Sequence, residues 1–343
     1  MNVDEALRAI PKAELHLHLE GSVSTETFAT LARHHGVGLP DGDPADLYRY
    51  DTLVDFLAVY SLVCASIRTG DDFARVTREC LERCAASGAR YVELFFSPES
   101  HLEFVDYPTM LAGVLRGMDD ASAEVGIDSR VVPAINRELG AGRAVEFVEL
   151  VQAHRDDRVI GVGLDFDEAG HPPAGFVEAF ALARSYGLHR TSHAGEVGPA
   201  ANVRDGIELL DCERVDHGYN VVDDAELMAQ CASSGIPFTV CPTTTTYTTE
   251  HRDLTDRRHP IRRMADAGLV ITVNSDDPTM FGVDLAHEYS VLHHSMGFTV
   301  AELAQCALNG IEAAWVDDGT RATWRSEWSA EIDRVLSALD APA

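Results

Sequence analysis

Eight short runs rich in apolar and β-branched residues recur along the chain. They lie at residues 13–19, 89–97, 129–135, 159–165, 189–194, 213–217, 236–241 and 269–275. Between them, apolar residues return at intervals of three and four, as in 72–86 and 143–154, which is the spacing of one helix face. Strands that alternate with helices are typical of a parallel sheet covered by helices. The pattern therefore predicts an α/β fold with eight parallel strands.

The number of strands favours one of two architectures. A doubly wound open sheet is the structural alternative, but eight strand-like runs favour closure into a (β/α)₈ TIM barrel. Glycines precede several incoming strands, as expected where helices end: Gly88, Gly126, Gly187, Gly235 and Gly268. We expect a single domain over residues 1–343, with C-terminal helices from about 315 to 343.

Two connections are longer than a barrel needs, and each follows the carboxyl end of a predicted strand. Residues 20–72 hold more than one helical pattern, so extra helices are expected between strands one and two. Residues 242–260 form a polar, threonine-rich loop after strand seven. Because TIM-barrel active sites lie at the carboxyl ends of the strands, both segments are candidate lids.

Charge and residue content limit the partners, the compartment and the kinds of site expected for the protein. The formal net charge is −29, which disfavours a nucleic acid or an anionic membrane surface as partner, because phosphate binding needs a basic face. The seven cysteines are odd in number and scattered, as expected of reduced thiols in the cytoplasm. The only lysine is Lys12. A P-loop, and a lysine that bridges two metals from mid-barrel, are therefore excluded.

Two histidines, His16 and His18, lie on the first predicted strand. Side chains alternate along a strand, so both imidazoles point to the same face. The pair alone is a weak signal, since packed or hydrogen-bonded histidines are the commoner explanation. Other polar residues follow at later strand ends: His193, His217, Asp276 and Asp277. Since these strand ends meet at one rim of a barrel, we expect the side chains to converge there.

This set predicts a hydrolytic metal site. Three imidazoles and a carboxylate suit one Zn²⁺ per chain, although iron or manganese could use the same donors. A second metal near Asp165 is less favoured, because no lysine is available to bridge. Glu196 is a candidate proton shuttle, and His217 with Asp276 could orient and deprotonate the water. Asp277 could hold a heterocycle nitrogen, the alternative being a cap on the following helix.

Five ordered motifs resemble the signature of the adenosine deaminase family. They are HLHLEGS (16–22), SHAGEVG (192–198), DHG (216–218), CPTTTT (241–246) and NSDDP (274–278). The resemblance implies a metal-dependent barrel that hydrolyses the 6-amino group of a purine and releases ammonia. It also implies roles for particular residues. Zinc would be bound by His16, His18, His193 and Asp276; N1 would be protonated by Glu196; water would be activated by His217 with Asp276; N7 would be held by Asp277.

The substrate is the least determined part of the prediction. We expect adenosine or an adenosine derivative, such as 6-aminodeoxyfutalosine, as the substrate, which would give an inosine-type product. The alternative is free adenine, which would give hypoxanthine. Three features resemble adenine-acting members of the family: Asp216, the segment GLDFDEAGHPP (163–173) and the segment FFSPESH (95–101). The polar 242–260 loop and NSDDPTMFG favour larger substrates. Candidate substrate-binding residues are Asp277, Glu20, Asp165 and Asp167.

Two other classes of protein are weighed against this one. A different metal-dependent amidohydrolase, cleaving an amide or ester, is disfavoured by Glu196 in the HAGE motif and by the lack of a bridging lysine. A catalytically silent barrel that serves as a binding protein would be expected to have lost a ligand or the glutamate, and this chain keeps them all. The partner expected is a small purine, and a homo-oligomer is compatible with the sequence.

Overall fold

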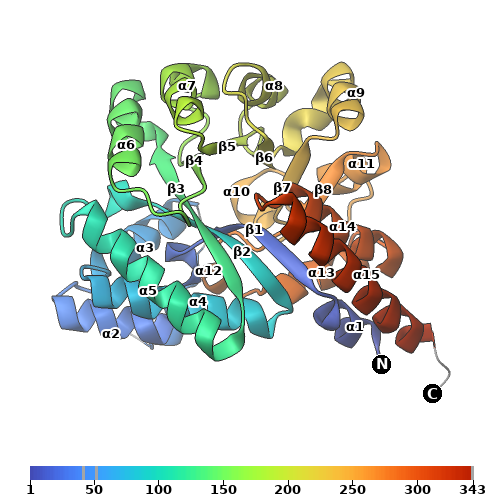
Figure 1. Ribbon diagram of the computed structural model, residues 1–343, viewed down its shortest axis with the longest axis horizontal. Helices are drawn as coiled ribbons and strands as arrows, with labels where there is room; N and C mark the ends of the chain where they lie inside the picture. Colours follow the sequence, from blue (N-terminus) through green and yellow to red (C-terminus); the bar gives the residue numbers. More distant parts are fainter. Residues whose placement is uncertain (41–42, 51–52, 341–343) are drawn as a thin grey trace.

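Eight parallel strands form a nearly closed barrel at the centre of the molecule (Figure 1). The computed structural model describes residues 1–40, 43–50 and 53–340. The strands are β1 (Lys12–His18), β2 (Ala89–Phe96), β3 (Asp128–Asn136), β4 (Gly161–Asp165), β5 (His189–Ala194), β6 (Arg214–His217), β7 (Pro237–Val240) and β8 (Val270–Val273). A parallel bridge between Leu17 and Asp276 joins the first strand to the segment after the last. The predicted TIM barrel and its eight strands are confirmed.

Helices follow the strands and cover the outside of the barrel (Figure 1). The outer ring comprises α5 (Tyr107–Val125), α6 (Ala141–Ala153), α7 (Val177–Ser185), α8 (Ala200–Glu208), α9 (Ala225–Ser234), α11 (Pro260–Asp266) and α14 (Val300–Ala313). Helix α6 shows the pattern that the sequence predicted, with Phe147, Val148 and Val151 buried. Gly126 and Gly235 end α5 and α9 in the left-handed conformation, as expected. In the described parts of the chain, no helix is long and apolar enough to cross a bilayer.

The predicted extra helices between strands one and two are present. They are α2 (Thr25–His35), α3 (Leu53–Ser66) and α4 (Gly70–Ala86). The first two residues of the apolar stretch 51–67 lie outside the described residues. Helix α3 passes over the barrel mouth, where its Phe56 and Tyr60 pack with Phe281 from the connection after β8. Through α3, this insertion forms part of the wall above the carboxyl ends of the strands, whereas α4 packs against α5 and β2.

Two predicted segments differ in detail from the structure. The 242–260 segment is not loop throughout, because residues Thr245–Thr248 form the short helix α10. The threonines there turn their hydroxyls inward, and Thr245 donates to the Pro242 carbonyl oxygen at 2.7 Å. After β8 come α12 (Pro278–Phe281) and α13 (Leu285–His294). The predicted C-terminal helices are one helix, α15 (Asp318–Asp340), which packs near α1 (Val3–Ala9); residues 341–343 lie outside the described chain.

A buried ion pair closes the amino end of the barrel. Arg214 Nη1 lies 2.7 Å from Glu93 Oε2, and neither side chain is exposed. The backbone N–H of Trp315 donates to Glu93 Oε1 at 2.6 Å, and the guanidinium group lies 4.0 Å from the centre of the Trp315 ring. These two side chains pair with each other instead of facing solvent, although Arg214 Nε and Nη2 have no hydrogen-bond partner among the described residues. The carboxyl end is thereby left as the open mouth of the barrel.

The single lysine is also buried. Lys12 has no exposed surface, and its Nζ donates to the carbonyl oxygens of Ile10 at 2.7 Å, Arg8 at 3.2 Å and Ser87 at 3.3 Å. Three acceptors match the three donors of an ammonium group. The residue thus fastens the start of β1 to the end of α4.

Candidate metal centre and active site

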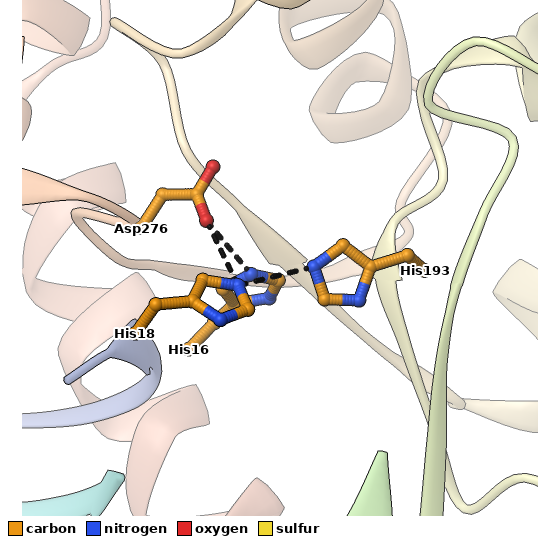
Figure 2. A group of neighbouring side chains, drawn as sticks. All are labelled: His16, His18, His193 and Asp276. Carbon is orange, nitrogen blue, oxygen red and sulfur yellow. Dashed lines mark hydrogen bonds and ion pairs between the residues drawn. The ribbon is translucent and has the colours of Figure 1, made fainter. Parts of the chain in front are cut away.

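Three histidines and an aspartate converge inside the barrel mouth (Figure 2). His16 and His18 project from β1, His193 from β5, and Asp276 follows β8. Asp276 Oδ1 lies 3.1 Å from His16 Nε2 and 3.3 Å from His18 Nε2. The Nε2 atoms of His18 and His193 are 3.3 Å apart. The four residues are buried, and their ligand atoms all lie within 4.8 Å of one another, so the four predicted ligands are brought together.

Asp276 reaches the histidines through an unusual backbone conformation. Its φ of 60° lies in the left-handed region, which costs a residue other than glycine about 1–3 kcal/mol. Two hydrogen bonds to β1 hold it there: the Asp276 N–H donates to the His16 carbonyl oxygen at 3.2 Å, and the His18 N–H donates to the Asp276 carbonyl oxygen at 2.8 Å. The contact that closes the barrel is therefore the contact that places the carboxylate.

The donor set fits one zinc ion. Imidazole nitrogens with a single carboxylate oxygen are characteristic ligands of Zn²⁺, whereas Ca²⁺ and Mg²⁺ prefer sites built from oxygen. His16 Nδ1 donates to the Thr239 hydroxyl at 3.0 Å, and that hydroxyl donates to Asp216 Oδ1 at 2.9 Å. With its proton on Nδ1, His16 presents the lone pair of Nε2 to the centre, as a ligand must.

Asp216 orients two of the candidate ligands from behind. It pairs with His193 across β5 and β6, and its Oδ2 lies 3.7 Å from His193 Nδ1. The Thr191 hydroxyl donates to the same oxygen at 2.8 Å. Burial opposes ionisation, but the electrostatic interaction and the hydrogen bond with His16 hold the pKa of Asp216 below its usual value. The sequence reading treated Asp216 only as a substrate marker and missed this positioning role.

His217 presents an unprotonated nitrogen to the site. The Tyr219 hydroxyl donates its one proton to the Cys241 carbonyl oxygen at 3.1 Å, so it accepts from His217 Nδ1 at 3.2 Å. The ring proton therefore lies on Nδ1, and Nε2 carries the lone pair. Burial, with the neighbouring charge of His16, lowers the pKa of His217 to about 4. This nitrogen is thus suited to accept a proton.

Glu196 stands opposite His217, with Oε2 at 3.7 Å from His217 Nε2. The Thr248 hydroxyl of α10 donates to the other oxygen, Oε1, at 2.6 Å. Burial, followed by the negative charge of Asp276, raises the pKa of Glu196 to about 7. A carboxyl group with such a pKa can give and take a proton near neutral pH.

The loop that carries Glu196 is organised by a second buried carboxylate, Glu168. Its Oε2 accepts from the backbone N–H groups of Glu196 at 3.1 Å, Val197 at 3.0 Å and Gly198 at 2.9 Å. Its Oε1 accepts from the Gly195 N–H at 2.5 Å and from the side-chain amide of Asn202 at 2.9 Å. Five donors on one carboxylate fix the loop. Sequence reasoning missed Glu168, although it lies inside a quoted motif.

Asp277 is buried beside the candidate metal ligands and lines the pocket. It stands at the start of α12 but makes no side-chain capping bond there, and its Oδ1 has no protein partner among the described residues. Burial, with the charge of Asp276, raises the pKa of Asp277 to about 8. A Cβ at Gly21 would lie 1.8 Å from Asp277 Oδ1, so the glycine is needed for this approach. These contacts favour a role in binding over the helix-cap alternative.

A cavity of about 380 Å³ lies above these groups. Its upper wall is apolar, with Phe56 and Tyr60 from α3 and Phe166 after β4. Seven carboxylic side chains line the rest, and the described lining residues include neither lysine nor arginine: Glu138, Asp165, Asp167, Glu168, Glu196, Asp276 and Asp277. A pocket with this lining favours a neutral or cationic ligand over an anionic one.

The three remaining candidate substrate residues occupy different places. Asp165 lines the pocket; its Oδ2 accepts from the Ser97 hydroxyl at 3.3 Å, and its Oδ1 is buried with no partner among the described residues. Asp167 also lines the pocket, but its oxygens accept from backbone N–H groups of its own turn, at 3.1 and 3.2 Å. Glu20 is not part of the wall. It is fully buried against His101, 3.0 Å away, and its Oε2 has no partner in the part of the chain that the structure describes.

Known proteins share this architecture and sequence. The sequence model of the adenosine deaminase family matches residues 11–330. The adenine deaminase of Vibrio parahaemolyticus is 36% identical over 323 residues, which cover 93% of this chain and 95% of that protein. The adenine deaminase of Streptomyces coelicolor is 36% identical, with 96% of each chain covered.

Two solved structures resemble the barrel closely. An amidohydrolase from Burkholderia ambifaria with bound zinc superposes with a TM-score of 0.92 at 38% identity, covering 99% of this chain and 95% of that chain. The adenine deaminase of Arthrobacter aurescens gives 0.88 at 32% identity, covering 95% and 100%. The family resemblance and the class of metal-dependent hydrolase that the motifs predicted are confirmed. This chain belongs to the adenosine deaminase family.

Proposed function

We propose that the protein is a zinc-dependent adenine deaminase, which hydrolyses adenine to hypoxanthine and ammonia. The observation that carries the proposal is the pocket. Its volume of about 380 Å³ is near the lower end of the range for small-molecule sites, and its wall is acidic. Three relatives of at least 32% identity bear the name adenine deaminase. A small uncharged base suits such a site better than a nucleotide does.

The metal-binding residues would be His16, His18, His193 and Asp276. Bound zinc supplies the activation of a water molecule, lowering its pKa from 15.7 towards about 7. His217 Nε2, which carries a lone pair, would accept a proton from the attacking water, assisted by the Asp276 carboxylate. Glu196 in its acid form would give its proton to N1 of the purine, which makes C6 more electrophilic. The proton that His217 takes from the water would then go to the departing amino group, so that ammonia leaves. The Glu196 carboxylate would regain a proton from the C6 hydroxyl as the carbonyl forms.

The remaining polar groups would hold the rest of the ring. Asp277 Oδ1 is buried and has no partner among the described residues. Because burial raises the pKa of Asp277 to about 8, its acid form would be present near neutral pH and would donate a hydrogen bond to N7. Free adenine also carries an N–H on its five-membered ring, where adenosine carries a ribose. Asp165 Oδ1 lies in the pocket wall, has no partner among the described residues, and would accept from this N–H. Glu20 is buried nearby, since both carboxylates accept hydrogen bonds from Ser97. Asp167 shapes the adjoining turn.

Ammonia release from a panel of purines tests the substrate. A site that hydrogen-bonds an N–H rejects analogues lacking it by about 10⁴-fold or more. We therefore expect kcat/KM for adenine to exceed that for adenosine and 2′-deoxyadenosine by at least about 10³-fold, with AMP inactive. Preference for adenosine, the alternative substrate, would overturn the assignment to adenine and leave the deaminase chemistry in place.

We also propose that the protein works in the cytoplasm. All seven cysteines are free and buried, from Cys64 to Cys306, which suits a reducing compartment. Fractionation of the cells that produce the protein, with detection of the full chain, tests this location.

A further inference from the structure

A second cluster of ligand-type side chains lies next to the first. His217, Cys241 and Asp276 each offer a ligand atom within 4.8 Å of the other two, and all three residues are buried. They come from the ends of β6, β7 and β8, whereas the first cluster draws on β1, β5 and β8. We infer that His217, Cys241 and Asp276 form a second site, for a soft divalent cation such as Cd²⁺ or excess Zn²⁺.

The cysteine is directed into the barrel by strand alternation. Thr239, two residues earlier on β7, turns its hydroxyl inward to His16 and Asp216. A residue two positions on faces the same side, which places the Cys241 side chain inward as well. Its backbone is fixed on both sides by Tyr219, whose hydroxyl accepts from the Cys241 N–H at 3.0 Å and donates to its carbonyl oxygen at 3.1 Å.

Each of the three donor atoms is available to an ion. The Cys241 sulfur has only a weak contact, 4.0 Å from the Thr239 carbonyl oxygen. His217 Nε2 holds a lone pair, because its ring proton is on Nδ1. Asp276 Oδ1 serves the histidines of the first cluster, and Figure 2 shows its other oxygen turned away from them. Asp276 can therefore bridge the two sites, one oxygen to each.

The chemistry of this set selects the cation. Thiolate ligands favour soft ions, and Mg²⁺ and Ca²⁺ prefer oxygen alone. Binding converts the Cys241 thiol to a metal thiolate and releases one proton to solvent, with no change of oxidation state. The acidic pocket above, which includes Glu196 at 3.7 Å from His217 Nε2, raises the local concentration of cations. Occupancy also removes the lone pair of His217, so it should inhibit; this consequence rests on the proposed function, whereas the binding does not.

Spectroscopic titration tests the site on the intact protein. Protein loaded with one equivalent of zinc is titrated with Cd²⁺, and a thiolate-to-cadmium charge-transfer band is followed in the near ultraviolet. We expect the band to saturate at one equivalent, and Cys241→Ser to abolish it. Cys231→Ser is the matched control, because Cys231 is equally buried but lies on α9 at the barrel exterior. The control should titrate like the unmodified protein.

A second variant covers the case in which Cys241→Ser does not fold. His217→Asn keeps the thiol but removes the nitrogen ligand, and it should weaken Cd²⁺ binding at least about tenfold. Circular dichroism confirms folding of each variant. The inference is overturned if the unmodified protein gives no thiolate band, if the band survives in folded Cys241→Ser, or if His217→Asn binds Cd²⁺ as tightly as the unmodified protein. Because no purine is present, these results are independent of the substrate assay.

Discussion

Replacement of Glu168 by glutamine is the sharpest test of how the Glu196 loop is held. The change keeps the size of the side chain but removes its charge and converts one acceptor oxygen into an NH₂ donor. If the remaining oxygen keeps the three bonds from Glu196, Val197 and Gly198, the new NH₂ faces the donors of Gly195 and Asn202. The Asn202 amide can rotate to present its oxygen, but the backbone N–H of Gly195 cannot turn away. The new NH₂ group and the N–H of Gly195 would then be two buried donors that face each other with no acceptor between them.

The magnitude follows from these bonds. Hydrogen bonds to a charged group contribute about 1.5–3 kcal/mol each, against about 0.5–1.5 kcal/mol for neutral partners, so three weakened bonds cost roughly 3 kcal/mol. The unsatisfied N–H of Gly195 adds about 1–3 kcal/mol. A neutral amide is easier to bury than a carboxylate, which offsets part of this loss. We expect a net decrease of about 2–5 kcal/mol in the free energy of unfolding.

Urea-induced unfolding and steady-state kinetics together form the assay. Displacement of Glu196 by about 1 Å should lower kcat by about 100-fold, with a smaller effect on KM. Glu149→Gln, a change of the same type at an exposed position of α6, should alter stability by less than about 0.5 kcal/mol. The reasoning is refuted if Glu168→Gln matches that control in both stability and kcat. Loss of stability with unchanged kcat would leave Glu168 a purely structural role.

Three further predictions concern the residues that face the pocket. Glu196→Gln should retain the metal yet lower kcat by about 100-fold or more, since an amide cannot deliver a proton; undiminished turnover would exclude Glu196 from the proton path. Burial raises the pKa of Glu196 to about 7 and its acid form is the donor, so kcat/KM should fall about tenfold per pH unit above 7. A profile that stays flat to pH 9 contradicts this role. Asp277→Ala should raise KM and lower kcat, and an effect seen only in thermal unfolding would instead support the helix cap.

The sequence predicts the fold well because the local signals agree. Eight β-rich runs alternate with helix-period segments, and glycines such as Gly126 and Gly235 end helices where expected. The short helix α10 was not predicted, because threonine-rich segments have low helix propensity. There, inward hydroxyl groups such as that of Thr245 bond to the backbone instead. The conformation of that segment is therefore set by tertiary contacts and not by local helix propensity.

The candidate metal ligands were easier to single out from the sequence than the residues that position them. His16 and His18 are identified as candidates by their residue type and by the alternation of side chains along a strand. Asp216 and Glu168 act by accepting hydrogen bonds from groups 23 to 34 positions further along the chain, so no local pattern marks their roles. Their presence inside quoted motifs was the available signal. Glu20 shows the converse, since its position next to the ligands predicted contact with substrate, yet its side chain lies behind the wall.

The buried amino group of Lys12 can serve as a chemical probe of local opening at the start of β1. No other side chain in the sequence bears a primary amine, and three carbonyl oxygens enclose this one. Acylating reagents can therefore reach a lysine only in molecules in which β1 has separated from α4. Mass spectrometry of the single labelled peptide would report how often that happens. Since β1 carries both His16 and His18, the labelling rate should fall when zinc is bound. Such a decrease would show that metal binding makes local opening of β1 less frequent.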